Sequence, residues 1–402
     1  MLSSNQYASP YNKIKDKNLM DKSYIKPISN GGGGQRVDNK RLIGLDLLRI
    51  SLALLIFLFH SHMHILKCDY GVMNGFVNMG AIAMTGFFLL SGYVINLSTC
   101  KSDMASSKEI GKFYMKRMIT ILPLYYTYAL VNVAINIIEN GSVAAIEELL
   151  LFPIEILCIQ SVFASLFSFS HNGGSWFISC IMICYFVFPL LKVITNGIND
   201  RTRTYIILVL SGILLWSPFV EYFFKCQSIY SNPFFRMLEF VIGLLVCQLN
   251  MKHDTENKFI LFLRQPCICL LSVIILILGV SIAQYIHIPG YYMLYSWIAL
   301  PCFVSLLFSL GHSRFDKLQD SKIIHYLSAL SFSFFLSQLL IVWNTVHFFT
   351  EKLELYGYIA NIFNILLSFA ICFCIANLLY FLVERPSTKY FKAKIFWKKY
   401  NI

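Results

Sequence analysis

Residues 44–64 read GLDLLRISLALLIFLFHSHMH. The stretch is apolar enough to cross the hydrocarbon core of a bilayer, which takes about 20 residues of α-helix. It nevertheless contains three groups that water solvates strongly, namely Asp46, Arg49 and His60. A charged group at the bilayer centre costs about 2.5–3.5 kcal/mol on insertion scales, and such groups usually face the protein interior. The stretch therefore predicts a membrane helix with a functional polar face.

The three polar residues share one side of that helix. At about 100° per residue, the eleven steps from Arg49 to His60 bring the two side chains to within roughly 20° of each other, about 16 Å apart along the axis. Asp46 precedes Arg49 by three residues and lies on the same face. The alternatives are a structural Asp46–Arg49 pair that reaches water at the interface and a packing role for His60.

The composition of the whole chain agrees with a membrane protein. Of its 402 residues, 57% are hydrophobic and 13% are charged, whereas soluble domains carry about 25% charged residues. The net charge of +12 comes from short basic clusters between apolar segments, so we attribute it to membrane topology and expect no nucleic-acid partner.

The 12 cysteines lack paired CxxC motifs and indicate neither a disulfide framework nor a zinc site. His62 points away from His60 and His64 on a helix, so we expect no metal there.

Apolar segments along the chain predict an all-α polytopic integral membrane protein with about ten transmembrane helices. They lie near 42–66, 78–98, 118–138, 175–195, 204–222, 233–250, 259–284, 291–311, 323–349 and 358–383. The connections are alternately basic and poor in basic residues, which places both termini in the cytoplasm. The acidic stretch at 143–170 is expected to be a loop or an interfacial helix.

The two ends of the chain differ from its middle. Residues 1–40 are polar, rich in lysine and contain a run of four glycines, which predicts a disordered cytoplasmic tail. They lack the apolar segment of a cleavable signal peptide. We expect a transmembrane domain over 41–390 and a basic cytoplasmic tail over 391–402.

Several motifs resemble, in the same order, those of the membrane acyltransferases called type 3 acyltransferases. The first is the Asp46-x-x-Arg49 pair with His60 eleven residues after the arginine. The others are the blocks GFFLLSGY (86–93), FYMKR (113–117), SWF (175–177), RMLEFVIG (236–243) and VERP (383–386). The resemblance covers about residues 41–390.

The chain departs from the family pattern at three positions. Thr120, Ile181 and Gln338 stand where many members carry an arginine, a glutamate and a histidine. These departures leave the substrate and any second catalytic group open.

The resemblance implies an O-acyltransferase of the inner (plasma) membrane, surrounded by lipids. Such an enzyme moves an acyl group, usually acetyl, from acyl-CoA to a hydroxyl of a cell-envelope glycan, polysaccharide or lipid-linked saccharide. Acetyl-CoA is then a co-substrate, and no permanently bound cofactor is expected. The alternatives are a transporter or flippase for an acylated glycan intermediate and a catalytically inactive scaffold.

Acyl transfer to a hydroxyl needs a base that accepts the hydroxyl proton during the attack. His60 is the candidate base, because neutral imidazole accepts protons near pH 7. We assign Asp46, Arg49 and His60 to the catalytic set.

The donor needs cations for its phosphates on the cytoplasmic side. Lys116 and Arg117 lie there by topology, and Arg49 lies deeper, where its planar donor fork suits a phosphate or the thioester end of the donor. We also assign Ser91 and Tyr93 to acyl-CoA binding. The alternative for Ser91 is close packing of helices, as small residues allow in membranes.

Three residues near the predicted outer face are candidates for acceptor binding. They are Trp176, Arg236 and Glu239. The alternatives are anchoring of Trp176 in the membrane interface and a purely structural pair of Arg236 with Glu239. The block 384–386 is expected to end the last helix rather than to contact substrate.

The predicted topology is testable by labelling. In a cysteine-free background, a cysteine at position 288 should react with an impermeant thiol reagent in sealed cells, because 288 lies in a connection without basic residues. A cysteine at position 316 lies in a basic connection and should stay unlabelled. Labelling at 316 in sealed cells would overturn this topology.

Overall fold

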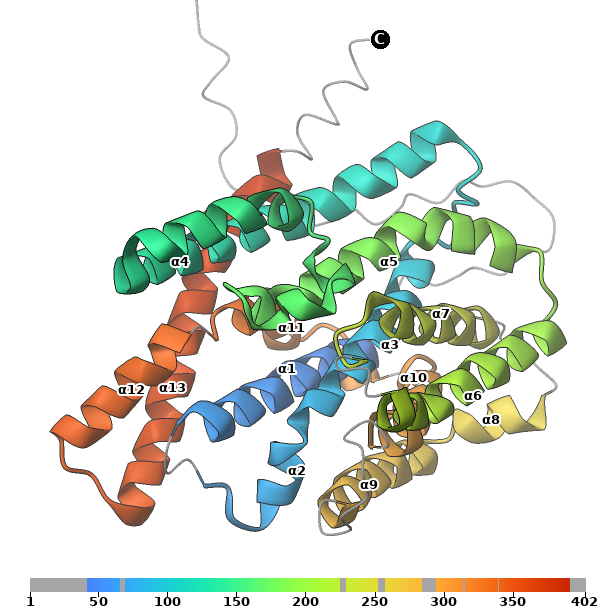
Figure 1. The fold of residues 1–402 in the computed structure, drawn as a ribbon. Helices are drawn as coiled ribbons and strands as arrows, with labels where there is room; N and C mark the ends of the chain where they lie inside the picture. The colour runs from blue at the N-terminus through green and yellow to red at the C-terminus, as the bar shows by residue number, and fades with distance from the viewer. Residues whose placement is uncertain are drawn as a thin grey trace, which may run out of the picture. The chain divides into compact units, whose positions relative to one another are not determined.

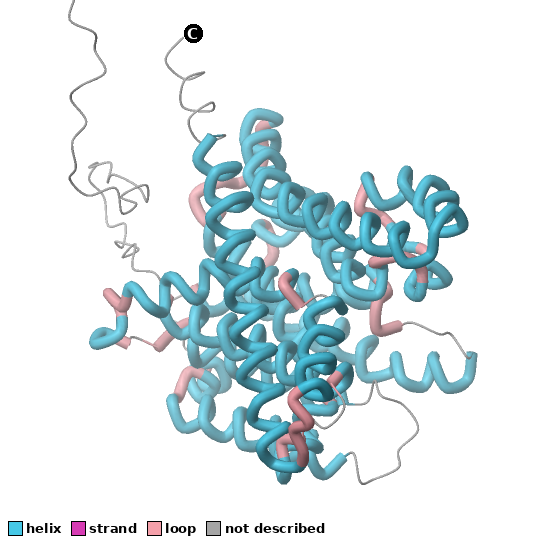
Figure 2. The backbone as a smooth tube through the Cα atoms, turned by 90° about the vertical axis from the view of Figure 1, so that its left-hand side faces the viewer, coloured by secondary structure: helices cyan, strands magenta, loops and turns pink. Residues whose placement is uncertain are grey.

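The computed structural model describes residues 42–65, 69–224, 229–251, 257–283, 294–313, 315–338 and 340–390. The tails predicted at 1–40 and 391–402 lie outside these residues. The described part of the chain is helical and contains no β-strand (Figure 2).

Helices of very different length make up the fold (Figure 1). The long ones are α1 (Ile43–His64), α3 (Ala83–Ser98), α4 (Ser107–Ile156), α5 (Asn172–Asn196), α6 (Asp200–Phe224), α7 (Pro233–Asn250), α9 (Pro266–Ala283) and α13 (Gly357–Leu379). The shorter ones are α2 (Asn74–Asn78), α8 (Lys258–Leu263), α10 (Leu300–Leu310), α11 (Lys322–Leu336) and α12 (Leu340–Lys352). π-Helical turns at Leu294–Ala299 and Tyr380–Glu384 adjoin α10 and α13.

Eight helices within the described residues are long and apolar enough to cross a membrane. They correspond to eight of the ten predicted segments. The other two segments, 291–311 and 323–349, contain shorter apolar helices at Ser296–Leu310 and Lys322–Leu336. The chain is therefore an all-α polytopic membrane protein, as predicted. The cytoplasmic placement of the termini stays a prediction.

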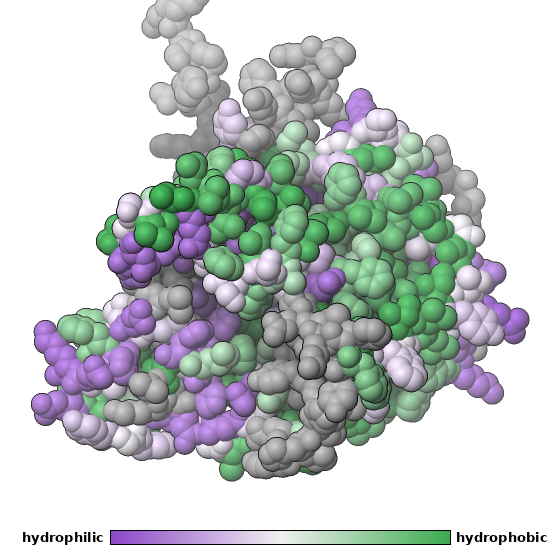
Figure 3. Space-filling view, in the orientation of Figure 1, coloured by the Kyte–Doolittle hydropathy of each residue, from purple (hydrophilic) through white to green (hydrophobic). Residues whose placement is uncertain are grey.

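The surface carries the apolar side chains expected of a protein that faces lipid. Figure 3 shows a broad hydrophobic area, with hydrophilic residues gathered at its lower left and right edges. Exposed large hydrophobic side chains on α4, α6 and α9 include Leu130, Ile138, Trp216, Leu270 and Ile282. Monomeric soluble proteins rarely expose apolar patches of such extent, so this surface fits a lipid environment.

Helix α4 turns back on itself at Gly141. This glycine has φ 68° and ψ −144°, a backbone conformation that glycine adopts without a Cβ penalty. The Tyr125 hydroxyl donates a hydrogen bond to the Glu155 carbonyl oxygen (2.8 Å), and Asn136 Nδ2 donates to Glu148 Oε1 (2.7 Å). Residues 143–156, the first part of the predicted non-spanning stretch 143–170, thus form a helix that packs against the third predicted span.

The closest contact between long helices joins α3 to α7. A Cβ on Gly92 would lie 1.9 Å from the carbonyl oxygen of Phe240, and a Cβ on Gly243 would lie 1.9 Å from that of Leu89. Only glycine fits at either position. Small residues let membrane helices approach until their backbones touch, and packing is a main force that joins helices in lipid. The two blocks 86–93 and 236–243 therefore form one packing interface.

Helices α1 and α11 lie side by side and run parallel. Near the start of α1, Asp46 contacts Ser328 of α11. Near the end of α1, His60 contacts Gln338, which follows α11. From the first contact to the second, the residue numbers increase on both sides, so the two helices run in the same direction. The polar stripe of α1, formed by Asp46, Arg49 and His60, therefore faces one partner along its length.

Three predicted segments differ from the structure. The segment predicted as one span at 259–284 is divided between α8, which ends at Leu263, and α9, which begins at Pro266. The segment predicted as one span at 323–349 is interrupted, because α11 ends at Leu336 and α12 begins at Leu340. The block 384–386 does not end the last helix, which continues to residue 390. Proline has no backbone N–H and clashes with the preceding turn of an α-helix. The wider π-helical turn that precedes Pro386 lets the helix continue through this residue. Glu384 points inward and accepts a hydrogen bond from Ser333 (2.7 Å).

The α3–α7 contact predicts the effect of one added methyl group. Gly92→Ala should force the helices apart and lower the free energy of unfolding by about 1–3 kcal/mol, the usual cost of overpacking. Gly212→Ala in α6 is the matched control, because no atom lies within 4 Å of its Cβ position, and it should be neutral or stabilising. Thermal unfolding in detergent measures both. Equal midpoints for Gly92→Ala and wild type would contradict the packing described here.

Candidate active site

Asp46 lies at the centre of a polar cluster between α1 and α11. The carboxylate is 5% exposed and accepts a hydrogen bond from Ser328 Oγ at 2.6 Å. Its second oxygen lies 3.6 Å from His325 Nδ1. Arg49 Nη1 donates to Ser328 Oγ (3.3 Å) and lies 3.9 Å from the Asp46 carboxylate. Asp46 thus links the two helices, while the Arg49 side chain stays 29% exposed and accessible to a ligand.

Arg49, Arg117 and Ser91 meet around the side chain of Tyr185 in α5. The guanidinium carbon of Arg117 lies 5.6 Å from the Tyr185 ring centre. Ser91 and Arg49 lie in the neighbourhood of the same Tyr185 hydroxyl. Lys116 precedes Arg117 and is exposed at the surface. Four of the five residues predicted to bind the donor therefore lie in or beside one cationic region.

Tyr93 is the exception among the five. Its side chain is 1% exposed, and its hydroxyl accepts a hydrogen bond from Asn250 Nδ2 at 2.9 Å. Arg264 Nε donates in turn to Asn250 Oδ1 (2.9 Å). Tyr93 follows Ser91 by two residues, which on a helix is about 200° of rotation. It therefore faces α7 rather than Tyr185, and this position gives it a packing role.

His60 lies in the last turns of α1, and Nδ1 of its ring is 2.7 Å from Oε1 of Gln338. The ring of His64 follows one turn later, with the ring centres 6.0 Å apart. His62 points elsewhere and lies against Tyr70, with 6.4 Å between the ring centres. The interruption between α11 and α12 thus supplies the hydrogen-bond partner of the predicted base.

Arg236 and Glu239 form a buried ion pair on α7. They are 3% and 5% exposed, and Arg236 Nη1 donates to both carboxylate oxygens at 2.9 and 2.8 Å. Thr85 of α3 donates to the same carboxylate (2.8 Å). The guanidinium carbon lies 5.6 Å from the Trp176 ring and 4.9 Å from the Tyr230 ring, which favours the cation. The structure thus brings together the three residues predicted for the acceptor.

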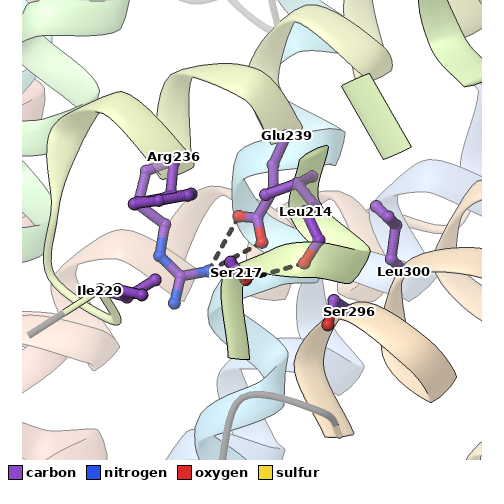
Figure 4. A pocket seen from close by; sticks show the side chains of 8 residues that line it. Leu214, Ser217, Ile229, Arg236, Glu239, Ser296 and Leu300 are labelled. Carbon is purple, nitrogen blue, oxygen red and sulfur yellow. Dashed lines mark hydrogen bonds and ion pairs between the residues drawn. The ribbon is translucent and has the colours of Figure 1, made fainter. Parts of the chain in front are cut away.

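A small pocket of about 20 Å³, enough space for about one water molecule, adjoins this pair (Figure 4). Arg236 and Glu239 enter it from α7, Ser217 from α6, and Ser296 from the π-helical turn before α10. The other lining residues are apolar. Its wall combines an ion pair, hydroxyl groups and aliphatic side chains, so it offers hydrogen bonds to a water molecule or to a single hydroxyl group of a ligand.

Several residues that complete these sites were missed by sequence reasoning. Tyr185, Ser328, Thr85 and Gln338 contact predicted site residues from helices far away in the sequence. Two of them carried a signal in the sequence. Gln338 stands at a position where many members of the resembled family carry a histidine, and Tyr185 follows the SWF block (175–177) on the predicted span 175–195. For the others, polarity within an apolar segment was too common a feature to single them out.

Comparison with known proteins gives a consistent family match. The family model for an acyltransferase domain (type 3) matches residues 42–382. The chain is similar to the acyltransferase MdmB of Streptomyces mycarofaciens, with 27% identity over 234 residues. This alignment covers 51% of the chain and 57% of the relative, so the chain spans little more than half of that relative's length. No solved structure matches the chain.

The buried pair predicts a large effect of removing one charge. Glu239→Gln should lower the free energy of unfolding by about 3–5 kcal/mol, because Arg236 then keeps an uncompensated buried charge. A double variant, Arg236→Leu with Glu239→Leu, removes both charges and should recover much of that loss. Unfolding in detergent measures stability, and acyl transfer is measured on the same samples. A fully active double variant would rule out acceptor binding by the pair.

Proposed function

Because the chain belongs to the type 3 family of membrane acyltransferases, we propose that it acetylates a hydroxyl of a cell-envelope saccharide. The donor is acetyl-CoA on the cytoplasmic side of the plasma membrane. The acceptor is a glycan, a polysaccharide or a lipid-linked saccharide. Family membership favours acyl transfer over transport of an acylated glycan.

The main support for this proposal is that α11 and the following Gln338 hold the polar stripe of α1 in place by hydrogen bonds. Arg49 contacts Ser328 near one end of the stripe, and His60 contacts Gln338 near the other. Eleven residues of helix separate Arg49 from His60, which corresponds to about 16 Å. A cation and a potential base thus face the same side of one helix. This arrangement suits acetyl-CoA as the donor, with its phosphates near the cation and its thioester near the base.

The proposed chemistry needs one proton acceptor at the outer end. Neutral His60 takes the proton of the acceptor hydroxyl as the hydroxyl oxygen attacks the thioester carbonyl carbon. The carbon–sulfur bond of acetyl-CoA then breaks, and the leaving thiolate receives the proton from the imidazolium. The products are the acetyl ester and CoA, and His60 returns to its neutral form.

The proposed donor site is the cationic region around Tyr185. Arg117 and the exposed Lys116 provide positive charge for the donor phosphates, and Arg49 provides a planar fork with two parallel donors. The aromatic ring of Tyr185 holds the Arg117 guanidinium in place. Asp46 takes no direct part in this scheme, since its carboxylate is hydrogen-bonded to Ser328 and orients Arg49.

The proposed acceptor site is the pocket beside Arg236 and Glu239. Saccharide hydroxyl groups donate and accept hydrogen bonds, and the pocket offers an ion pair with the hydroxyl groups of Ser217 and Ser296. Trp176 packs against Arg236 and thereby fixes the position of the guanidinium group.

The base and the donor-binding arginines can be told apart by measuring turnover and acetyl-CoA binding separately. His60→Ala should lower the rate of acetyl transfer by about 10²–10⁴-fold and leave acetyl-CoA binding nearly unchanged, because a base acts mainly in the transition state. Arg49→Lys and Arg117→Lys should weaken acetyl-CoA binding by about 10- to 160-fold, the equivalent of a charge-assisted hydrogen bond. Calorimetry in nanodiscs measures binding, and transfer of radiolabelled acetyl groups into membrane vesicles measures turnover.

His62→Ala is the control for this experiment, because His62 lies on another face of α1 beside Tyr70. It should keep both binding and turnover. Loss of donor binding in His60→Ala, with intact binding in both arginine variants, would refute the assignment.

A further inference from the structure

Gln338 occupies an interruption in a membrane segment, directly beside His60. The apolar segment 323–349 contains α11 up to Leu336 and α12 from Leu340, and Gln338 lies between them. Non-helical backbone at membrane depth is tolerated only where it is buried in protein or lines a water-filled cavity. At this break the side chain of Gln338 faces α1, where it meets His60.

Two hydrogen bonds determine the orientation of the Gln338 amide. Nε2 donates to the carbonyl oxygen of Phe334 at 3.3 Å, and Oε1 lies 2.7 Å from His60 Nδ1. Turning the amide over would bring Oε1 against the Phe334 carbonyl, two acceptors with no hydrogen between them. The amide oxygen therefore faces the imidazole.

This orientation decides which nitrogen of His60 carries the proton. An amide oxygen only accepts hydrogen bonds, so Nδ1 of His60 must be the donor. In the neutral ring, the other nitrogen then holds the lone pair. Within the described part of the chain, Nε2 of His60 has no hydrogen-bond partner. Its lone pair is therefore available to a ligand.

Packing one turn away holds the two side chains in register. Phe57 of α1 and Phe334 of α11 lie with their ring centres 5.7 Å apart. Phe57 precedes His60 by three residues, and Phe334 precedes Gln338 by four. The aromatic contact thus fixes α1 against α11 immediately beneath the hydrogen bond, which limits rotation of the imidazole.

We propose that Gln338 is a positioning residue for acyl transfer, and that its amide oxygen holds His60 in the tautomer with the proton on Nδ1, so that Nε2 is the atom that accepts the acceptor's hydroxyl proton. The inference rests on the proposed function of His60. A neutral amide serves this purpose without a charge. A carboxylate at the same position would stabilise the imidazolium and leave less of the neutral base at a given pH. The titratable group that acts on His60 electrostatically from its own helix is His64, and the partner that faces it from the α11–α12 interruption is the uncharged Gln338.

Two substitutions of Gln338 separate a positioning role from a merely structural one. Gln338→Met keeps about the same volume but offers only a weak thioether acceptor in place of the amide oxygen, so kcat should fall about 10- to 1,000-fold, with the KM for acetyl-CoA unchanged. Gln338→Glu keeps an acceptor at Nδ1 and should retain kcat within about tenfold of wild type at high pH. Its carboxylate favours the imidazolium, so the acidic limb of the kcat/KM profile should move to higher pH by about one unit or more.

Ser337→Ala is the matched control. Ser337 Oγ donates to the same Phe334 carbonyl oxygen (2.8 Å) but does not touch His60, so kcat and the pH profile should match wild type. The assay is transfer of radiolabelled acetyl groups from acetyl-CoA to the saccharide fraction of membrane vesicles from the expressing strain.

The outcomes separate this inference from the proposed function. An active Gln338→Met variant beside an inactive His60→Ala variant would overturn the role of Gln338 and leave the base intact. A Gln338→Glu variant whose acidic limb coincides with that of wild type would also overturn it. Wild-type turnover in His60→Ala would overturn the proposed function itself.

Discussion

The close contact between α3 and α7 positions the buried ion pair of the candidate site. Gly92 and Gly243 allow the two backbones to touch, and this proximity lets Thr85 of α3 reach Glu239 of α7. A side chain at either glycine would push the helices apart and separate Thr85 from Glu239. The same helix α3 carries Ser91 into the neighbourhood of Tyr185.

A second principle is the use of a neutral partner for the group that must change its charge. Gln338 holds His60 by a hydrogen bond, whereas Asp46 and Arg49 share Ser328 and lie 3.9 Å apart as an ion pair. In a low-dielectric interior a counter-ion would fix the protonation state of its partner, and removing it would leave a buried charge. A hydroxyl or an amide fixes orientation by hydrogen bonding and leaves the charge of the partner free to change or to meet a ligand.

The parts of the fold that were predictable from sequence are those with a local signal. The apolar runs located the spans, and the spacing of Asp46, Arg49 and His60 located the stripe, because helical periodicity is a property of neighbouring residues. The reversal at Gly141, the break before Gln338 and the face of Tyr93 were not predicted. Each depends on which helix lies opposite, and a chain that is apolar on nearly all sides gives no amphipathic pattern that identifies the neighbour.

The most direct test of the central claim is the structure of the protein in nanodiscs with a non-hydrolysable acetyl-CoA analogue, determined by electron cryo-microscopy. We expect the donor phosphates to lie against Lys116 and Arg117, and the acetyl end to point along α1 toward Nε2 of His60. Density for the nucleotide in the pocket beside Arg236 and Glu239, with the region around Tyr185 empty, would contradict it.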